Sequence, residues 1–185
     1  MIERRTLLKA GIGAGLGLSL TPELAICQDD PVSVRPKPGD LLVRVGDSMK
    51  QPLSPGEIKR GAKPIIAWAM DPKDETLRDG SRLNEVLLVR LDANTLTSET
   101  RSRAADGVVA YTAICTHMGC EVDDFLADEQ VLHCGCHGSK FDPKDDAKVV
   151  GGEAPRPLAA LPLKLDDGQL VVAGPFTARV GFDPA

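Results

Sequence analysis

Short apolar runs separated by turn residues and prolines dominate the chain after about residue 40. Strand-like runs occupy seven segments: 41–45, 65–68, 85–91, 108–114, 130–133, 161–165 and 170–172. They are short for helices, and several are rich in valine and isoleucine, which favour β-strands. The nearly all-aliphatic run at 85–91 predicts a buried strand, and the alternating leucines at 161–165 predict a half-buried one. We find no internal repeat and no long amphipathic helix, and predict one small all-β domain over residues 39–185.

Turn residues join several of these runs. Asp167–Gly168 predicts a tight turn between the last two runs. Asp128–Glu129 predicts the turn of an earlier hairpin, whose returning strand is 130–133. The segment 71–82 is polar and predicts a loop.

The N-terminal 27 residues differ in character from the rest of the chain. Arg4 and Arg5 precede apolar residues and a lysine, a pattern that resembles the twin-arginine export signal. A glycine-rich apolar stretch, 10–20, follows them. Residues 28–38 contain three prolines, which predict a semi-rigid linker. We therefore predict a signal or N-terminal anchor over 1–27, a linker over 28–38 and the domain over 39–185.

This N-terminus predicts a protein on the periplasmic side of a membrane. The uncharged run 10–22 is short for a bilayer span, which takes roughly 20 residues. Ile26 is unfavourable for lipoprotein processing at Cys27, and no clear cleavage site precedes that cysteine. We expect a membrane-anchored protein if the segment is retained and a soluble periplasmic protein if it is removed.

Composition narrows the class of protein. Apolar residues make up 42% of the chain and aromatic residues only 3%, which predicts a mainly aliphatic core. The formal net charge is −5, without the basic stripe that nucleic-acid binding requires. We expect no nucleic-acid partner.

The candidate chemistry lies in two short motifs, Cys115–Cys120 (CTHMGC) and Cys134–Ser139 (CGCHGS). Together they hold four of the five cysteines and two of the three histidines. Three interpretations remain open from the residues alone. One is a disulfide scaffold, the second is structural zinc with two cysteine and two histidine ligands, and the third is a [2Fe–2S] cluster with the same ligand types.

The paired motifs resemble those of the Rieske iron–sulfur proteins of respiratory chains. The resemblance extends over residues 106–174 and includes the later segment Gly152–Leu158 (GEAPRPL). It implies the Rieske fold, in which antiparallel sheets stack and two loops hold the cluster at their tips. It also implies one Rieske-type [2Fe–2S] cluster per chain.

Carried over residue by residue, the resemblance implies four iron ligands and one disulfide. Cys115 and Cys134 would bind the inner iron, and His117 and His137 the outer iron. Cys120 and Cys136 would form a disulfide that joins the two loops, which an exported protein can keep oxidised.

Three residues around the motifs are expected to tune the cluster. Ser139 matches the family serine whose hydroxyl bonds a bridging sulfide. Phe141 stands where many high-potential members have a tyrosine that donates to a cysteine ligand, which predicts a lower reduction potential. The first motif, with methionine at position 118, resembles the corresponding motif of the Rieske subunits of arsenite oxidases.

Glu153 is a further departure from the family, which often has proline at this position in the loop over the cluster.

The resemblance implies an electron-transfer protein. The third histidine, His133, cannot complete the two-histidine iron site of an oxygenase, so we expect no substrate chemistry within this chain. The first reading is the iron–sulfur subunit of a quinol–cytochrome c oxidoreductase-like complex, with membrane quinol, cytochrome b and a cytochrome c-type acceptor as partners. The alternative is the small relay subunit of a periplasmic molybdenum oxidase, arsenite-oxidase-like, whose partner is a large catalytic subunit.

Overall fold

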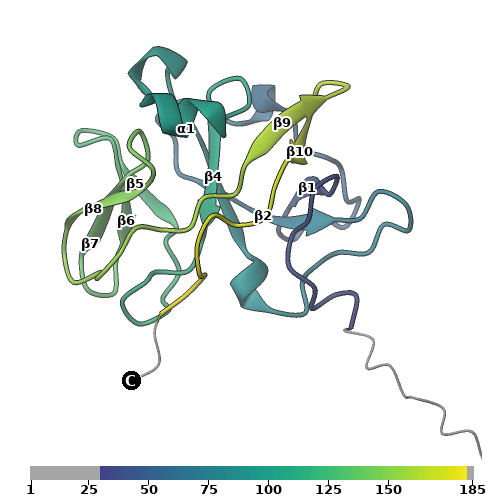
Figure 1. The fold of residues 1–185 in the computed structure, drawn as a ribbon, viewed down its shortest axis with the longest axis horizontal. Helices are drawn as coiled ribbons and strands as arrows, with labels where there is room; N and C mark the ends of the chain where they lie inside the picture. The colour runs from purple at the N-terminus through teal and green to yellow at the C-terminus, as the bar shows by residue number, and fades with distance from the viewer. Residues whose placement is uncertain (1–29, 183–185) are drawn as a thin grey trace, which may run out of the picture.

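Two antiparallel sheets form the fold (Figure 1) of the computed structural model, which describes residues 30–182. The larger sheet has the order β4-β3-β2-β1-β10-β9, and the smaller has the order β5-β6-β7-β8. The larger sheet contains β1 (Leu41–Arg44), β2 (Ile65–Met70), β3 (Val86–Arg90), β4 (Val108–Thr112), β9 (Leu163–Asp166) and β10 (Gln169–Val172). The smaller contains β5 (Asp124–Leu126), β6 (Val131–Cys134), β7 (Ser139–Asp142) and β8 (Lys148–Gly151). The predicted all-β class and Rieske-like stacking of antiparallel sheets are confirmed.

In the part of the chain that the structure describes, helical structure is confined to short segments in the connections. These are the 3₁₀ turns η1 (Pro55–Glu57), η2 (Arg82–Asn84) and η3 (Ala93–Thr95) and the helix α1 (Ser98–Ser102). Within residues 30–182, no helix has the length and apolar character needed to cross a bilayer. The predicted export signal lies outside the described residues.

Strands β3 and β4 form a wall between two apolar cores, which explains their nearly continuous apolar sequence. Along β3, Leu87 and Val89 face the core that the two sheets share, and Val86 and Leu88 face the core of the larger sheet. Successive side chains of a strand point to opposite faces, so both faces of β3 must be apolar. The prediction of a buried strand at 85–91 is confirmed.

The predicted turns are also present. Asp167 and Gly168 both have positive φ, 46° and 78°, and connect β9 to β10. Positive φ at both central residues suits the twist of a two-residue hairpin. Gln130, with φ of 54°, helps to reverse the chain between β5 and β6, next to the predicted Asp128–Glu129 turn.

Leu165 departs from the prediction for the 161–165 run. The run begins as a strand only at Leu163, and Leu165 is 45% exposed. Because β9 is an edge strand of the larger sheet, none of the described residues covers the outer part of this leucine.

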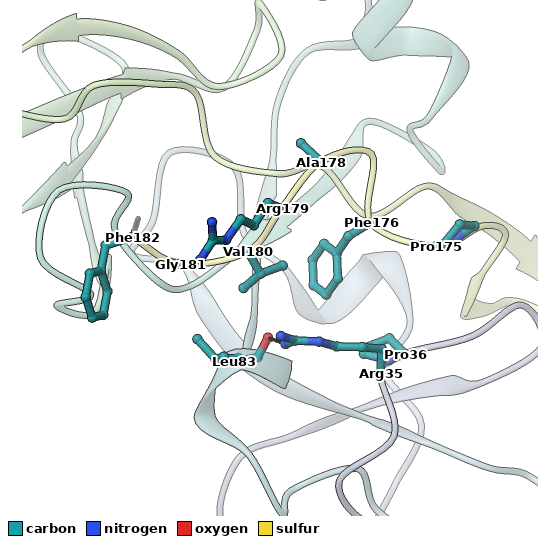
Figure 2. Close-up of a pocket in the computed structure, with 10 residues that line it drawn as sticks. All are labelled: Arg35, Pro36, Leu83, Pro175, Phe176, Ala178, Arg179, Val180, Gly181 and Phe182. Atoms are coloured by element: carbon teal, nitrogen blue, oxygen red, sulfur yellow. Dashed lines mark hydrogen bonds between the residues drawn. The ribbon is translucent and has the colours of Figure 1, made fainter. Parts of the chain in front are cut away.

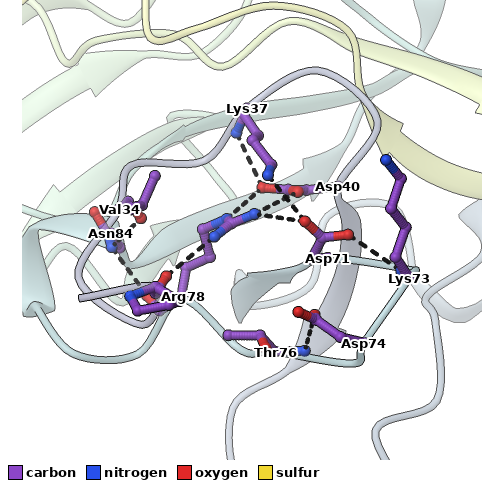
Figure 3. Close-up of polar contacts among 10 residues, drawn as sticks. Val34, Lys37, Asp40, Asp71, Lys73, Asp74, Thr76, Arg78 and Asn84 are labelled. Atoms are coloured by element: carbon purple, nitrogen blue, oxygen red, sulfur yellow. Dashed lines mark hydrogen bonds and ion pairs between the residues drawn. The ribbon is translucent and has the colours of Figure 1, made fainter. Parts of the chain in front are cut away.

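A buried ion pair joins the N-terminal end of the described chain to the larger sheet (Figure 3). Arg78 donates through Nε to Asp40 Oδ2 at 2.7 Å, through Nη2 to Asp71 Oδ2 at 3.2 Å and through Nη1 to the Pro31 carbonyl at 3.0 Å. The hydrogen bond with Asp40 raises the pKa of Arg78. A hydrogen bond with Lys37 is the main reason that the pKa of Asp71 falls to about 2. One guanidinium group therefore links the start of β1, the end of β2 and the segment before β1.

Part of the predicted linker lies against the domain through these contacts. Asn84 Nδ2 donates to the Val34 carbonyl at 2.9 Å, and the Gly80 amide donates to the Val32 carbonyl at 2.9 Å. Residues 30–38 form turns without any strand or helix. The division of the chain at residues 27 and 38 stays a prediction.

Candidate metal centre

Two loops at the ends of strands carry the two cysteine–histidine motifs. The first loop, 115–120, follows β4, and the second, 135–138, connects β6 to β7. A disulfide between Cys120 and Cys136 joins them, with a Cα–Cα distance of 6.6 Å. This confirms the bridge that the resemblance implied. The first loop is further closed by the Cys115 amide, which donates to the Cys120 carbonyl at 2.8 Å.

The other two cysteines of the motifs are free thiols, Cys115 and Cys134, and both are buried. Burial raises the pKa of Cys134, and the neighbouring Cys115 raises it further. The sulfur atoms of Cys120, Cys134 and Cys136 lie within 4.8 Å of one another. Cys120 and Cys136 are bonded to each other, so these three cysteines are not a set of metal ligands. Their proximity shows that the disulfide lies beside the Cys134 thiol.

The imidazoles of His117 and His137 lie against each other edge to face. Their ring centroids are 4.6 Å apart, and the rings are inclined by 82°. His117 Nδ1 is buried and has no hydrogen-bond partner among the described residues. Such an atom costs roughly 1–3 kcal/mol unless something binds it, so it indicates a partner of another kind. His117 Nε2 lies 3.4 Å from Glu153 Oε2.

A third loop, which follows β8, closes over the first two. The Ala154 amide donates to Ser139 Oγ at 3.1 Å, and Thr116 Oγ1 donates to the Arg156 carbonyl at 2.7 Å. A Cβ at Gly152 would lie 2.4 Å from Ser139 Cα and 2.5 Å from the Gly138 carbonyl oxygen. The loop therefore approaches the second loop at a distance that only glycine permits.

The model of the Rieske [2Fe–2S] domain matches residues 68–162, which is more than half of the chain. This chain belongs to the Rieske family. As a Rieske domain, it binds one [2Fe–2S] cluster. Two buried free thiols, two adjacent imidazoles and an unpartnered buried Nδ1 are chemically suited to that group.

Individual relatives differ in how much of each protein aligns. The cytochrome bc1 complex Rieske iron–sulfur subunit of Streptomyces lividans is 30% identical over 148 residues, covering 77% of this chain and 85% of that protein. The putative respiratory nitrate reductase subunit Rieske of Haloferax mediterranei is 43% identical over 76 residues, covering 40% of this chain and 34% of that protein. The soluble domain of Rieske protein II from Sulfolobus acidocaldarius is 24% identical, with a TM-score of 0.38, over 52% of this chain and 66% of that one.

Besides Ser139, the residues expected to tune the cluster are Phe141 and Met118, and they differ in exposure. Phe141 in β7 is fully buried, in the same core as Cys115 and Cys134. Met118, at the tip of the first loop, is 60% exposed. Phe141 is thus placed to affect the interior of the site, and Met118 its outer surface.

His133, predicted to have no role, lies in β6 and is partly exposed. Its Nδ1 is 3.9 Å from Asp124 Oδ2, on the paired strand β5. Lys63 Nζ also lies 3.4 Å from Asp124 Oδ1. These contacts connect the smaller sheet to the loop before β2 and do not involve either cysteine–histidine motif.

A C-terminal segment, 175–182, supports the Rieske loops in a way that sequence reasoning missed. The Arg156 guanidinium donates to the carbonyls of Arg179, at 2.8 Å, and Gly181. A Cβ at Gly119 would lie 2.8 Å from the Phe182 ring, so the segment reaches the first loop. The only signal for these contacts was that Arg156 belongs to the segment that carried the family resemblance.

The same segment forms one wall of an apolar cavity of about 560 Å³. Figure 2 shows Phe176 and Val180 on that wall, facing Arg35 and Leu83. Arg35 donates to Asn84 Oδ1 at 3.2 Å and to the Leu83 carbonyl, so its guanidinium makes structural contacts on the opposite wall of the cavity.

Proposed function

We propose that Cys115, Cys134, His117 and His137 are the cluster ligands. The two buried thiols would bind the inner iron and the two imidazoles the outer iron. The observation that carries this assignment is the unpartnered Nδ1 of His117, buried beside the second imidazole. When bound, such a cluster supplies a one-electron couple, whose potential is raised by histidine ligation.

We further propose that the chain is the electron-transfer subunit of a quinol–cytochrome c oxidoreductase-like complex on the periplasmic side of the membrane. Membrane quinol and cytochrome b would be its partners on the donor side, and a cytochrome c-type protein its acceptor. The support is the Streptomyces lividans relative, of which the chain covers 85%. The chain's own residues also fit this role. The buried cysteines are shielded from solvent, and His137 is exposed, as contact with a redox partner would need.

The second candidate is a relay subunit of another oxidoreductase, such as a molybdenum oxidase with a large catalytic subunit. The observation that favours this type of assembly is the Haloferax mediterranei relative, which is named a putative respiratory nitrate reductase subunit Rieske. The exposed Met118 is compatible with it, as a contact for a large subunit.

Two measurements test these proposals in order. Electron paramagnetic resonance (EPR) of the reduced, purified protein should show a rhombic signal with average g below the free-electron value. His137→Ala and Cys134→Ser should abolish this signal, whereas His133→Ala should retain it. In membranes of the producing organism, deletion of the gene should abolish quinol-dependent reduction of cytochrome c. An unchanged rate, with loss of a periplasmic oxidase activity, would instead establish the relay function.

A further inference from the structure

We propose that Glu153 accepts a hydrogen bond from His117 Nε2 and thereby lowers the reduction potential of the cluster. This inference rests on the proposed assignment of His117 as a ligand. It gives a role to the residue at which this chain departs most clearly from the family pattern in the loop over the cluster.

The orientation of the His117 ring supports the contact. Its Nδ1 is buried without a partner, and its Nε2 lies 3.4 Å from Glu153 Oε2. A neutral imidazole that binds a metal through one nitrogen carries its proton on the other. Nε2–H therefore requires an acceptor, and a carboxylate is a common partner of metal-bound histidines. Among the residues described, Glu153 is the carboxylate within ion-pair distance of His117.

The backbone on both sides of Glu153 is held in place. Gly152 has φ of 76° and lies so close to Ser139 that no Cβ fits there. On the other side, the Ala154 amide donates to Ser139 Oγ at 3.1 Å. Glu153 thus stands between two residues that are anchored to the second cysteine–histidine loop, although its own side chain extends into solvent.

The contact has an electronic consequence. A carboxylate that accepts from a ligand imidazole raises the basicity of that ligand. Its negative charge also opposes the addition of an electron, which favours the oxidised state and lowers the potential. Because the Glu153 side chain is 63% exposed, solvent screens part of this effect.

The contact also makes the two imidazoles unequal. No carboxylate of residues 30–182 lies within ion-pair distance of His137, and its side chain is exposed. An effect that acts through this contact should therefore alter His117 and leave His137 unchanged.

The test is an EPR-monitored redox titration of the full chain and its Glu153 variants. Glu153→Ala should raise the potential by removing both charge and acceptor, and Glu153→Gln should raise it less because the amide oxygen still accepts. Glu153→Asp, which keeps the carboxylate, should give a potential closer to that of the wild type than Glu153→Ala does. The control is Asp166→Asn, which removes a carboxylate of 65% exposure at the edge of the larger sheet and should leave the potential unchanged.

A spectroscopic measurement separates a contact with one imidazole from a general effect of charge. Electron spin echo envelope modulation of the reduced cluster should show an altered nitrogen coupling for one of the two histidines in Glu153→Ala. An unchanged potential in Glu153→Ala, or an equal shift in Asp166→Asn, would overturn the inference while the cluster signal remains intact. Absence of the cluster signal from the wild-type protein would instead refute the ligand assignment, and the inference with it.

Discussion

At the scale of single residues, Phe141 occupies a position where one oxygen atom can change the redox chemistry. The ring is fully buried and shares its core with the thiols of Cys115 and Cys134. It pairs across the sheet with Leu132 and Val149, so its backbone position is determined on both sides. A hydroxyl added to this ring would be buried in the core that contains both thiols.

Phe141→Tyr should therefore raise the reduction potential. A buried hydroxyl requires a hydrogen-bond partner, and donation to a ligand sulfur stabilises the reduced cluster. Redox titration followed by EPR measures the shift. The control, Phe141→Leu, should lower stability by roughly 1–3 kcal/mol through the cavity it leaves, without raising the potential. A potential in Phe141→Tyr that is unchanged or lower, with the signal retained, would contradict the prediction.

At the scale of loops and strands, the close approach of the third loop to the second depends on Gly152. Gly152→Ala should push the loop away, because its Cβ would meet the Ser139 backbone at 2.4–2.5 Å. We expect loss of the Ala154–Ser139 hydrogen bond and faster loss of the cluster, measured as bleaching of its visible absorbance. Gly168→Ala is the matched control, since φ there is 78° but nothing lies within 4 Å. It should cost only about 1 kcal/mol of backbone strain and retain the cluster. Equal bleaching rates in the two variants would show that the close approach does not matter.

The strands that could be predicted from the sequence are those with enough apolar residues to identify a buried face. β3 and β4 belong to this group, and so do the hairpin strands beside Asp167–Gly168. β7 and β8 were not predicted, and β5 was implied only as the first strand of a hairpin, without bounds. Each has only three or four residues, and β7 and β8 include charged or glycine residues. Their strand structure depends on pairing with neighbours such as Leu132 opposite Phe141, which no local pattern reveals.

The residues of the candidate site could also be predicted only in part. The cysteines and histidines of the two loops could be identified because their spacing along the chain is itself the signal. The contacts that arrange them could not, because they join residues far apart in sequence. Thr116 bonds the Arg156 carbonyl across 40 positions, and Glu153 reaches His117 from the third loop. Such contacts follow from the fold and become visible only once the three loops are placed together.

At the scale of the whole molecule, two apolar cores separate the redox site from the main polar anchor of the domain. The core shared by the sheets contains Cys115 and Cys134. The core of the larger sheet lies on the other side of β3 and β4, and the buried pair of Asp40 and Arg78 ties the ends of its strands together. Within residues 30–182, none of the hydrogen bonds of the Arg78 guanidinium reaches the three loops of the site. Stability and redox potential should therefore respond to different substitutions.

Asp40→Asn tests this separation. Asp40 is 1% exposed and Arg78 3% exposed, so the substitution leaves a buried guanidinium without its main charged partner. We expect a loss of about 3 kcal/mol in the free energy of unfolding, at the lower end for a broken buried pair because Asp71 still contacts Arg78 at 3.2 Å. Urea unfolding followed by circular dichroism measures it. The control, Asp106→Asn, breaks the more exposed pair with Arg90 and should cost at most about 1 kcal/mol. Neither variant should change the reduction potential. A shift in Asp40→Asn alone would show that the larger sheet transmits strain to the loops that hold the cluster.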